Sequence, residues 1–131
     1  RHSSDIVKEY KNLTENQIKL FNEIKIHTRI LFSNLIVCDY FSVAQSITQG
    51  YELKKKTSDK IVNDTTEILL KTGLENGAMA GKVLGAGGGG YVLFIVNPEK
   101  RKSLIDKLNQ MKFKDVDFQI DYQGLDVRRI E

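Results

Sequence analysis

The most constraining feature of the sequence is a run of four glycines, Gly87 to Gly90, followed directly by the apolar segment YVLFIV at residues 91–96. Each glycine in a regular element costs about 0.5–1 kcal/mol relative to alanine, so the four together cost about 2–4 kcal/mol. Whole domains are stable by only about 5–15 kcal/mol. The run must therefore supply what other residues cannot, either positive φ angles or room for something to approach the backbone.

The first half of the chain has the apolar spacing of amphipathic helices. Thr14 followed by Gln17 is typical of a capping box. Asp39 and Ser58 are expected to cap two later helices, and Lys71 with Gly73 is expected to end the last of them. We predict helices over residues 5–11, from Thr14 to about residue 38, from Asp39 to the lysines 54–56, and from Ser58 to Gly73.

The second half changes to strand patterns. A short strand at residues 82–85 precedes the buried strand 91–96, and Asn97 with Pro98 opens a helix. Apolar and polar residues alternate from Val116 to Tyr122, which predicts a half-buried strand, and residues 125–130 are expected to form a last strand. The expected fold is α+β in one domain, residues 1–131: a helical block, then a small antiparallel sheet with packed helices.

Composition excludes several classes of function. A formal charge of +3 is too small to indicate nucleic-acid binding, and no apolar run approaches the roughly 20 residues that span a membrane. The single cysteine, Cys38, excludes an internal disulfide and fits a reducing compartment. The chain begins at Arg1 and its first methionine is Met79, so we expect it to be part of a longer protein.

Two familiar nucleotide motifs do not fit the glycine run. Gly85, Gly87 and Gly90 have the G-x-G-x-x-G spacing, but that motif requires a following helix, and here a strand follows. Gly81-Lys82 suggests a P-loop, yet Val83 stands where a Ser or Thr should bind magnesium. The remaining alternatives are a plain hairpin turn and a loop whose bare backbone lies against a phosphate-bearing ligand or another loop. Two glycines usually suffice for a hairpin, so we favour the second.

A resemblance supports this choice. The segment GAMAGKVLGAGGGGYVLFIVNPEKR, residues 77–101, closely resembles the third motif of the GHMP small-molecule kinases, and most of all their heptose 7-phosphate kinase branch. Residues 1–7, 50–61 and the closing residues 118–130 are similar to that branch as well. The resemblance implies the family's C-terminal domain, with a ferredoxin-like sheet. It also implies transfer of the γ-phosphoryl group of ATP to a sugar hydroxyl, assisted by Mg²⁺.

The resemblance also implies the site residues. In the family the glycine loop buttresses the phosphate loop of the N-terminal domain and shapes the pocket for nucleotide and sugar. The corresponding residues are Gly85, Ala86, Gly87, Gly88, Gly89 and Gly90. Lys82 matches a basic position of the family, and the opening segment with Arg1, Ser3 and Ser4 is expected near the domain junction; these four form a second tier. Ala80 replaces a glycine that relatives often have.

The family's main phosphate loop and its catalytic carboxylate are not in this chain. We therefore expect no catalytic residue and no metal ligand here, ATP and Mg²⁺ bound mainly by an N-terminal domain, and no kinase activity from the chain alone. The expected partners are a sugar or sugar phosphate, that N-terminal domain and a second copy of the chain, in the cytoplasm, without nucleic acid or membrane. The alternatives are a kinase for fucose or galactose, and a non-catalytic metabolite-binding or oligomerisation module.

Other polar residues have ordinary explanations. Cys38 is expected to be a buried small apolar residue, and His27 a packed residue of the long helix. The lysines 54–56 are expected to be a solvated helix end. Asp117 and Asp121 are explained by strand alternation without a metal.

Overall fold

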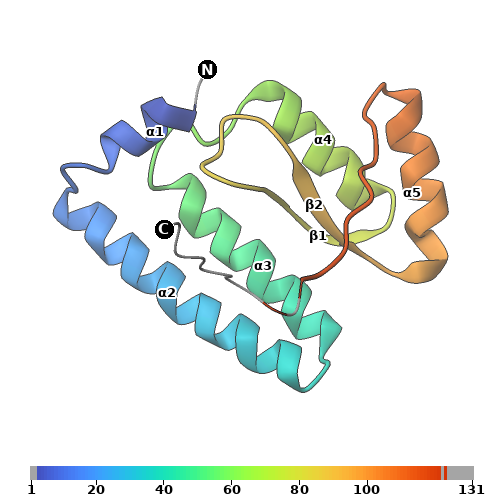
Figure 1. Ribbon diagram of the computed structural model, residues 1–131, viewed down its shortest axis with the longest axis horizontal. Coiled ribbons are helices and arrows are strands. Elements are labelled where there is room, and N and C mark those ends of the chain that lie inside the picture. The colour runs from blue at the N-terminus through green and yellow to red at the C-terminus, as the bar shows by residue number, and fades with distance from the viewer. Residues whose placement is uncertain (1–2, 122, 124–131) are drawn as a thin grey trace, which may run out of the picture.

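The computed structural model describes residues 3–121 and residue 123 of the 131-residue chain. In these residues, five helices accompany a two-stranded antiparallel sheet (Figure 1). The elements are α1 (Ser3–Glu9), α2 (Glu15–Ile36), α3 (Tyr40–Lys55), α4 (Asp64–Glu75), β1 (Ala78–Val83), β2 (Val92–Val96) and α5 (Pro98–Gln110). The expected α+β class, with helices first and an antiparallel sheet after them, is confirmed.

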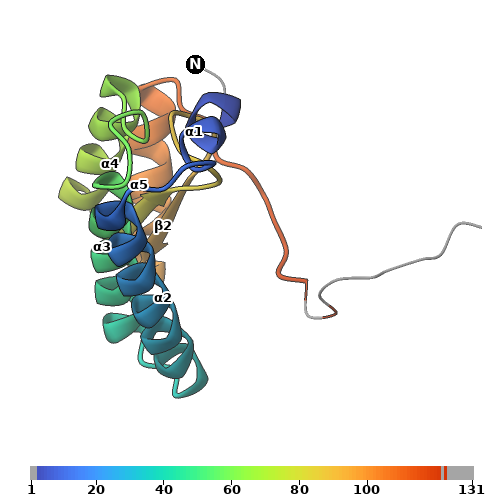
Figure 2. The ribbon, with the colours of Figure 1, turned by 90° about the vertical axis from the view of Figure 1, so that its left-hand side faces the viewer.

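Helices α2 and α3 lie side by side, and α3 and α4 both pack against β1 (Figure 1). Turned by 90°, the molecule shows these helices as one layer with the β1–β2 hairpin against it (Figure 2). The buried cluster between the layers joins α1, α3, α4, β1 and the α3–α4 connection. Its members are Ile6, Tyr51, Ile61, Leu70 and Val83. The connection between α3 and α4 is thus part of the core.

Three of the expected helix starts are confirmed. The Thr14 hydroxyl accepts a hydrogen bond from the Gln17 amide at 3.2 Å, and the Gln17 side chain accepts one from the Thr14 amide at 3.0 Å. Asp39 caps α3 through the Ser42 amide, and Asn97 caps α5 ahead of Pro98. Each cap satisfies backbone amides that have no partner within the helix, which is why short sequence signals place these ends well.

The predicted start of the fourth helix, with Ser58 as its cap, is wrong. Helix α4 starts at Asp64, and its N-cap is Asn63, whose side chain accepts from the Thr66 amide at 2.9 Å. Ser58 instead donates to the Glu9 carboxylate of α1 at 2.5 Å. The same hydroxyl accepts from the Lys60 amide at 3.2 Å, and the Ile61 amide donates to the Ser58 carbonyl at 3.2 Å. Residues 58–61 therefore form a short turn, and the helix begins only after Asn63.

The end of α4 was also misplaced. The helix continues to Glu75, two residues beyond Gly73. A Cβ on Gly73 would lie 2.1 Å from Cε1 of Phe94 in β2, so this glycine lets the helix approach the sheet rather than ending it.

The strand predictions were partly wrong. β1 spans Ala78–Val83 rather than 82–85. The bounds of β2 agree with the expected strand within one residue, but its five residues are half-buried and not buried as expected. Residues 116–121, expected to be a strand, form none, and Figure 2 shows this segment leaving the sheet. Alternation predicts an apolar face, but a strand also needs a neighbour for its backbone hydrogen bonds. The expected last strand, 125–130, lies outside the described residues.

Candidate functional site

The glycine-rich connection between β1 and β2 is the candidate site. Its hydrogen-bonded neck is formed by the Leu84 amide, which donates to the Tyr91 carbonyl at 2.9 Å. Five of its six residues between these two have positive φ: Gly85 (68°), Gly87 (111°), Gly88 (75°), Gly89 (145°) and Gly90 (94°). The requirement for positive φ, one of the two explanations open from the sequence, is therefore met at five positions.

The inner side of the loop rests on the α3–α4 connection. The Gly88 amide donates to the Ile61 carbonyl at 2.7 Å. A Cβ on Gly87 would lie 3.0 Å from both Cα and Cγ2 of Ile61, and Ile61 is fully buried. The close approach that the sequence suggested thus exists on this side, and the backbone approached is the chain's own.

Asn63 ties the loop to helix α4. Its amide nitrogen donates to the Gly88 carbonyl at 2.8 Å, while its oxygen caps α4 through the Thr66 amide. One side chain therefore fixes both the start of a helix and the middle of the loop. The sequence contained the signal, Asn63 with Thr66 three residues later, but the competing Ser58 was preferred.

The outer side of the loop is open. A Cβ on Gly85 or on Gly90 would meet no atom of the described residues within 4 Å. Among those residues, no acceptor is bonded to the amides of Gly85, Gly89 or Gly90. Successive backbone amides in a turn can form a concave anion site, so this side has free donors and open space for an anion.

Lys54, at the end of α3, bonds to the loop. Its ammonium donates to the Gly85 carbonyl, and the side chain is half-buried. Burial, with a smaller contribution from the charge of Lys82, lowers the pKa of Lys54. The expectation of a solvated lysine run is therefore wrong at this position, because the β1–β2 loop lies over the helix end. Lys55 pairs with Glu52 at 2.6 Å, and Lys56 is exposed as expected.

The second-tier residues lie in different places. Lys82 is half-buried in β1, opposite Leu93 of β2, three residues before Gly85. Ser4 is exposed in α1, Ser3 opens that helix, and Arg1 lies outside the described residues. Helix α1 itself reaches the loop, since a Cβ on Gly88 would lie 3.4 Å from Cδ1 of Ile6.

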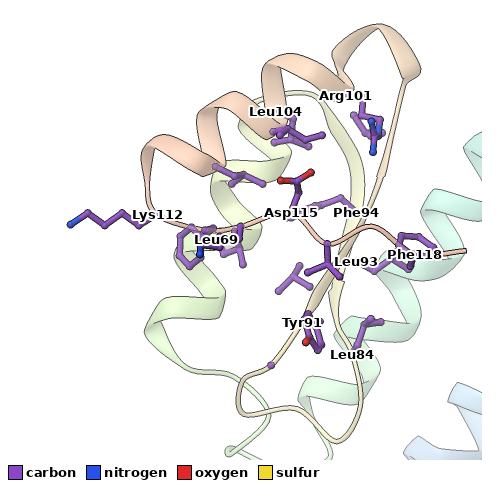
Figure 3. Close-up of a pocket in the computed structure, with 18 residues that line it drawn as sticks. Leu69, Leu84, Tyr91, Leu93, Phe94, Arg101, Leu104, Lys112, Asp115 and Phe118 are labelled. Atoms are coloured by element: carbon purple, nitrogen blue, oxygen red, sulfur yellow. The ribbon is translucent and has the colours of Figure 1, made fainter.

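An apolar cavity of about 640 Å³ lies beside β2, between α5 and the segment after it (Figure 3). Leu84 and Tyr91 place its lower end next to the glycine loop, Leu93 lies near its middle, and Phe118 lies at its right-hand side. Its walls are mostly hydrocarbon, so it is suited to apolar side chains and not to phosphate. It lies along the edge of β2 that has no partner strand among the described residues.

Metal binding and membrane insertion find no support in the residues the structure describes. No group of three His, Cys, Asp or Glu side chains is arranged to hold a metal ion in this part of the chain. Within the same residues, no helix has both the length and the apolar character needed to cross a bilayer. Cys38, expected to be buried, is exposed in the α2–α3 turn with φ of 56°. The candidate functional site is therefore the glycine loop, with its open amides, together with Lys54 and Lys82.

Comparison with known proteins assigns the chain to a family. Residues 39–114, more than half of the chain, match the family model described as GHMP kinases C terminal. The chain is 31% identical over 116 residues to the D-glycero-alpha-D-manno-heptose 7-phosphate kinase of Campylobacter jejuni subsp. jejuni serotype O:2 (strain ATCC 700819 / NCTC 11168). That match covers 88% of this chain and 34% of the relative.

Solved structures agree with the sequence match. The Methanococcus jannaschii mevalonate kinase superposes with a TM-score of 0.65 and 29% identity, over 84% of this chain and 32% of that one. A putative sugar kinase from Campylobacter jejuni matches with a TM-score of 0.50 and 34% identity, over 66% of this chain and 26% of the other. The chain spans about a third of the length of the kinases it matches. The chain therefore belongs to the GHMP kinases and contains the C-terminal domain of that family.

Proposed function

We propose that this chain acts within an ATP-dependent sugar kinase, which transfers the γ-phosphoryl group of ATP to a hydroxyl of a heptose phosphate. The family assignment supports phosphoryl transfer with ATP. The 31% identity to a heptose 7-phosphate kinase supports a phosphorylated heptose as acceptor over fucose or galactose. A cytoplasmic location follows from the same proposal, because ATP and sugar phosphates are cytoplasmic metabolites.

The observation that supports this function most is the two-sided glycine loop. Ile61 and Asn63 hold its inner side by hydrogen bonds of 2.7 and 2.8 Å to Gly88. On the outer side, Gly85 and Gly90 leave space with no described atom within 4 Å of a Cβ. A plain hairpin turn would not need a second element to hold it in place. A loop that must present its backbone to a phosphate group does, because the donors have to be preorganised.

In this proposal the loop holds phosphate groups in position and takes no part in the reaction itself. Its open amides and the ammonium of Lys54 lie where negative charge would be stabilised. Bound ATP and Mg²⁺ supply the transferable phosphoryl group and neutralise its charge. The described residues offer no carboxylate cluster for the ion, so we expect an N-terminal domain to hold ATP and Mg²⁺ and to dock against the outer side of the loop.

The test is a phosphoryl-transfer assay on a protein in which this chain follows a GHMP N-terminal domain. We expect ATP consumption that depends on a heptose 7-phosphate, with a new sugar phosphate detected by phosphorus NMR. We expect none from the 131-residue chain alone. Transfer to galactose or fucose but not to the heptose phosphate would contradict the acceptor. Absence of sugar-dependent turnover with every acceptor would favour the non-catalytic module.

A further inference from the structure

Two lysines near the glycine loop have no carboxylate partner among the residues that the structure describes. Lys54 and Lys82 are both half-buried, and neither is within ion-pair distance of an acidic group among the described residues. Their neighbours differ: Lys55 pairs with Glu52, and Lys60 pairs with Glu9. Among the described residues, Lys55 and Lys60 thus have a carboxylate partner, whereas the equally half-buried Lys54 and Lys82 have none.

This arrangement is unfavourable as it stands. Burial penalises a charged ammonium, and a neighbouring like charge adds to the penalty. Both effects act on Lys54, since burial first and Lys82 second lower its pKa. Support of the loop requires only the ammonium of Lys54. A second positive charge nearby, that of Lys82, makes this support less favourable. An anion between or beside the two ammonium groups would offset both penalties by its attraction to the positive charges.

The geometry leaves donors for such an anion. A lysine ammonium has three N–H donors, and Lys54 uses one of them on the Gly85 carbonyl. The space beside Gly85 is open, and its own amide has no acceptor among the described residues. The Lys54 ammonium and the unbonded Gly85 amide thus both lie at the start of the loop, beside open space.

We propose that Lys54 and Lys82 form a phosphate-binding pair at the entrance of the glycine loop, which holds a phosphate group that does not itself react. This inference rests on the proposed function for the source of that phosphate. A phosphorylated acceptor and the nucleotide share the same chemistry, an oxygen-rich anion that accepts charge-assisted hydrogen bonds. The pair would then select a phosphorylated sugar over a neutral one.

The first test measures phosphate binding by the full 131-residue chain, with inorganic phosphate as the probe. Amide NMR shifts of Gly85, Gly89 and Gly90 report the titration. We expect saturable shifts that weaken about tenfold or more in Lys54→Gln and in Lys82→Gln, since each loses a charge-assisted hydrogen bond. The matched control Lys56→Gln, an exposed neighbour, should bind as the parent does.

A second variant separates charge from support of the loop. Lys54→Gln can still donate to the Gly85 carbonyl but has no charge, whereas Lys54→Arg keeps the charge. We expect Lys54→Arg to retain phosphate binding within about threefold. Absence of phosphate-dependent shifts at the loop would overturn the proposal. Shifts that persist unchanged in both glutamine variants would overturn it as well.

The source of the phosphate is tested with three further probes: glucose 6-phosphate, glucose and ADP. Competition by glucose 6-phosphate but not glucose assigns the pair to the acceptor, and competition by ADP alone assigns it to the nucleotide. In the active kinase the first assignment predicts a raised KM for the sugar phosphate in Lys82→Gln, with the KM for ATP unchanged. Phosphate binding needs no turnover, so a failed kinase assay and a failed lysine pair give different results.

Discussion

Substituting Gly87 by alanine tests the contact between the loop and the core most severely. The new Cβ would lie 3.0 Å from Cα and Cγ2 of Ile61 and 3.1 Å from its carbonyl oxygen. Two of these three atoms are backbone, and Ile61 is fully buried, so neither side has room to move. Alanine would also have to keep φ near 111°, a region that L residues rarely adopt.

The expected loss can be estimated from these two effects. Holding a residue in an unfavourable backbone region costs about 1–3 kcal/mol, and overpacking a closed site costs another 1–3 kcal/mol or so. The reduced freedom of the unfolded chain returns about 0.4–1 kcal/mol. We therefore expect Gly87→Ala to lower the free energy of unfolding by about 1–5.5 kcal/mol, up to a large share of a typical domain's stability.

Urea unfolding of the chain followed by circular dichroism measures this loss. With a slope of about 2 kcal/mol per molar urea, the middle of the typical range, the midpoint should fall by about 0.5–3 M. The matched control is Gly50→Ala in α3, where a Cβ meets nothing within 4 Å. That variant should gain about 0.5–1 kcal/mol, because alanine favours a helix. A Gly87→Ala midpoint equal to the parent's would refute the contact with Ile61.

Two further substitutions test single hydrogen-bonding groups. Asn63→Ala removes both the cap of α4 and the bond to Gly88, and should lower the free energy of unfolding by about 1–3 kcal/mol. Asn63→Asp keeps the cap and should lower it by about 0.5–1.5 kcal/mol in the same urea assay. Equal losses in the two variants would contradict the bridging role of Asn63. Tyr51 is buried and its hydroxyl has no partner among the described residues, so Tyr51→Phe should leave stability unchanged or raise it by up to about 1 kcal/mol, and a clear loss would reveal a missed partner. Burial raises the pKa of Tyr51 to about 12 from 10.0, so the folded state favours the neutral phenol; this contribution is fully present below pH 10 and is lost as the pH rises through 12, which phenolate absorbance and alkaline unfolding both measure.

The local parts of the fold were predictable from the sequence. The caps at Thr14, Asp39 and Asn97 involve groups within three residues of each other, so the residue order alone determines them. The strand β2 was equally clear, since its five residues are all apolar, although they are half-buried and not buried as expected.

The errors came from distant partners. Ser58 has the chemistry of a cap and accepts from the Lys60 amide, but it also donates to Glu9, 49 residues away, and the turn that it closes does not continue as a helix. Gly73 has the chemistry of a helix end, but Phe94 packs against it. The alternation of apolar and polar residues from Val116 onward predicts a strand, but it could not reveal that β2 pairs only with β1 among the described residues. Local chemistry fixes what a residue is able to do, and tertiary contacts decide which option it takes.

The candidate site divides in the same way. The glycine run was visible in the sequence, because positive φ is a local requirement at Gly87 and its neighbours. Its support by Ile61 and Asn63 was not visible, because those residues come from a different connection. Lys54 was assigned to a solvated helix end, since nothing in its own neighbourhood indicates that a loop 31 residues later covers it.

The most direct test of the account is phosphoryl transfer by a kinase that carries Gly85→Asn in this chain. Asparagine tolerates φ near 68°, and the space beside Gly85 is open, so urea unfolding should change by less than about 1 kcal/mol. If that space belongs to a phosphate group or to the domain that holds it, kcat/KM should fall at least about tenfold, a loss of about 1.4 kcal/mol in transition-state binding. Full activity in a normally stable Gly85→Asn protein would show that nothing presses on the loop there.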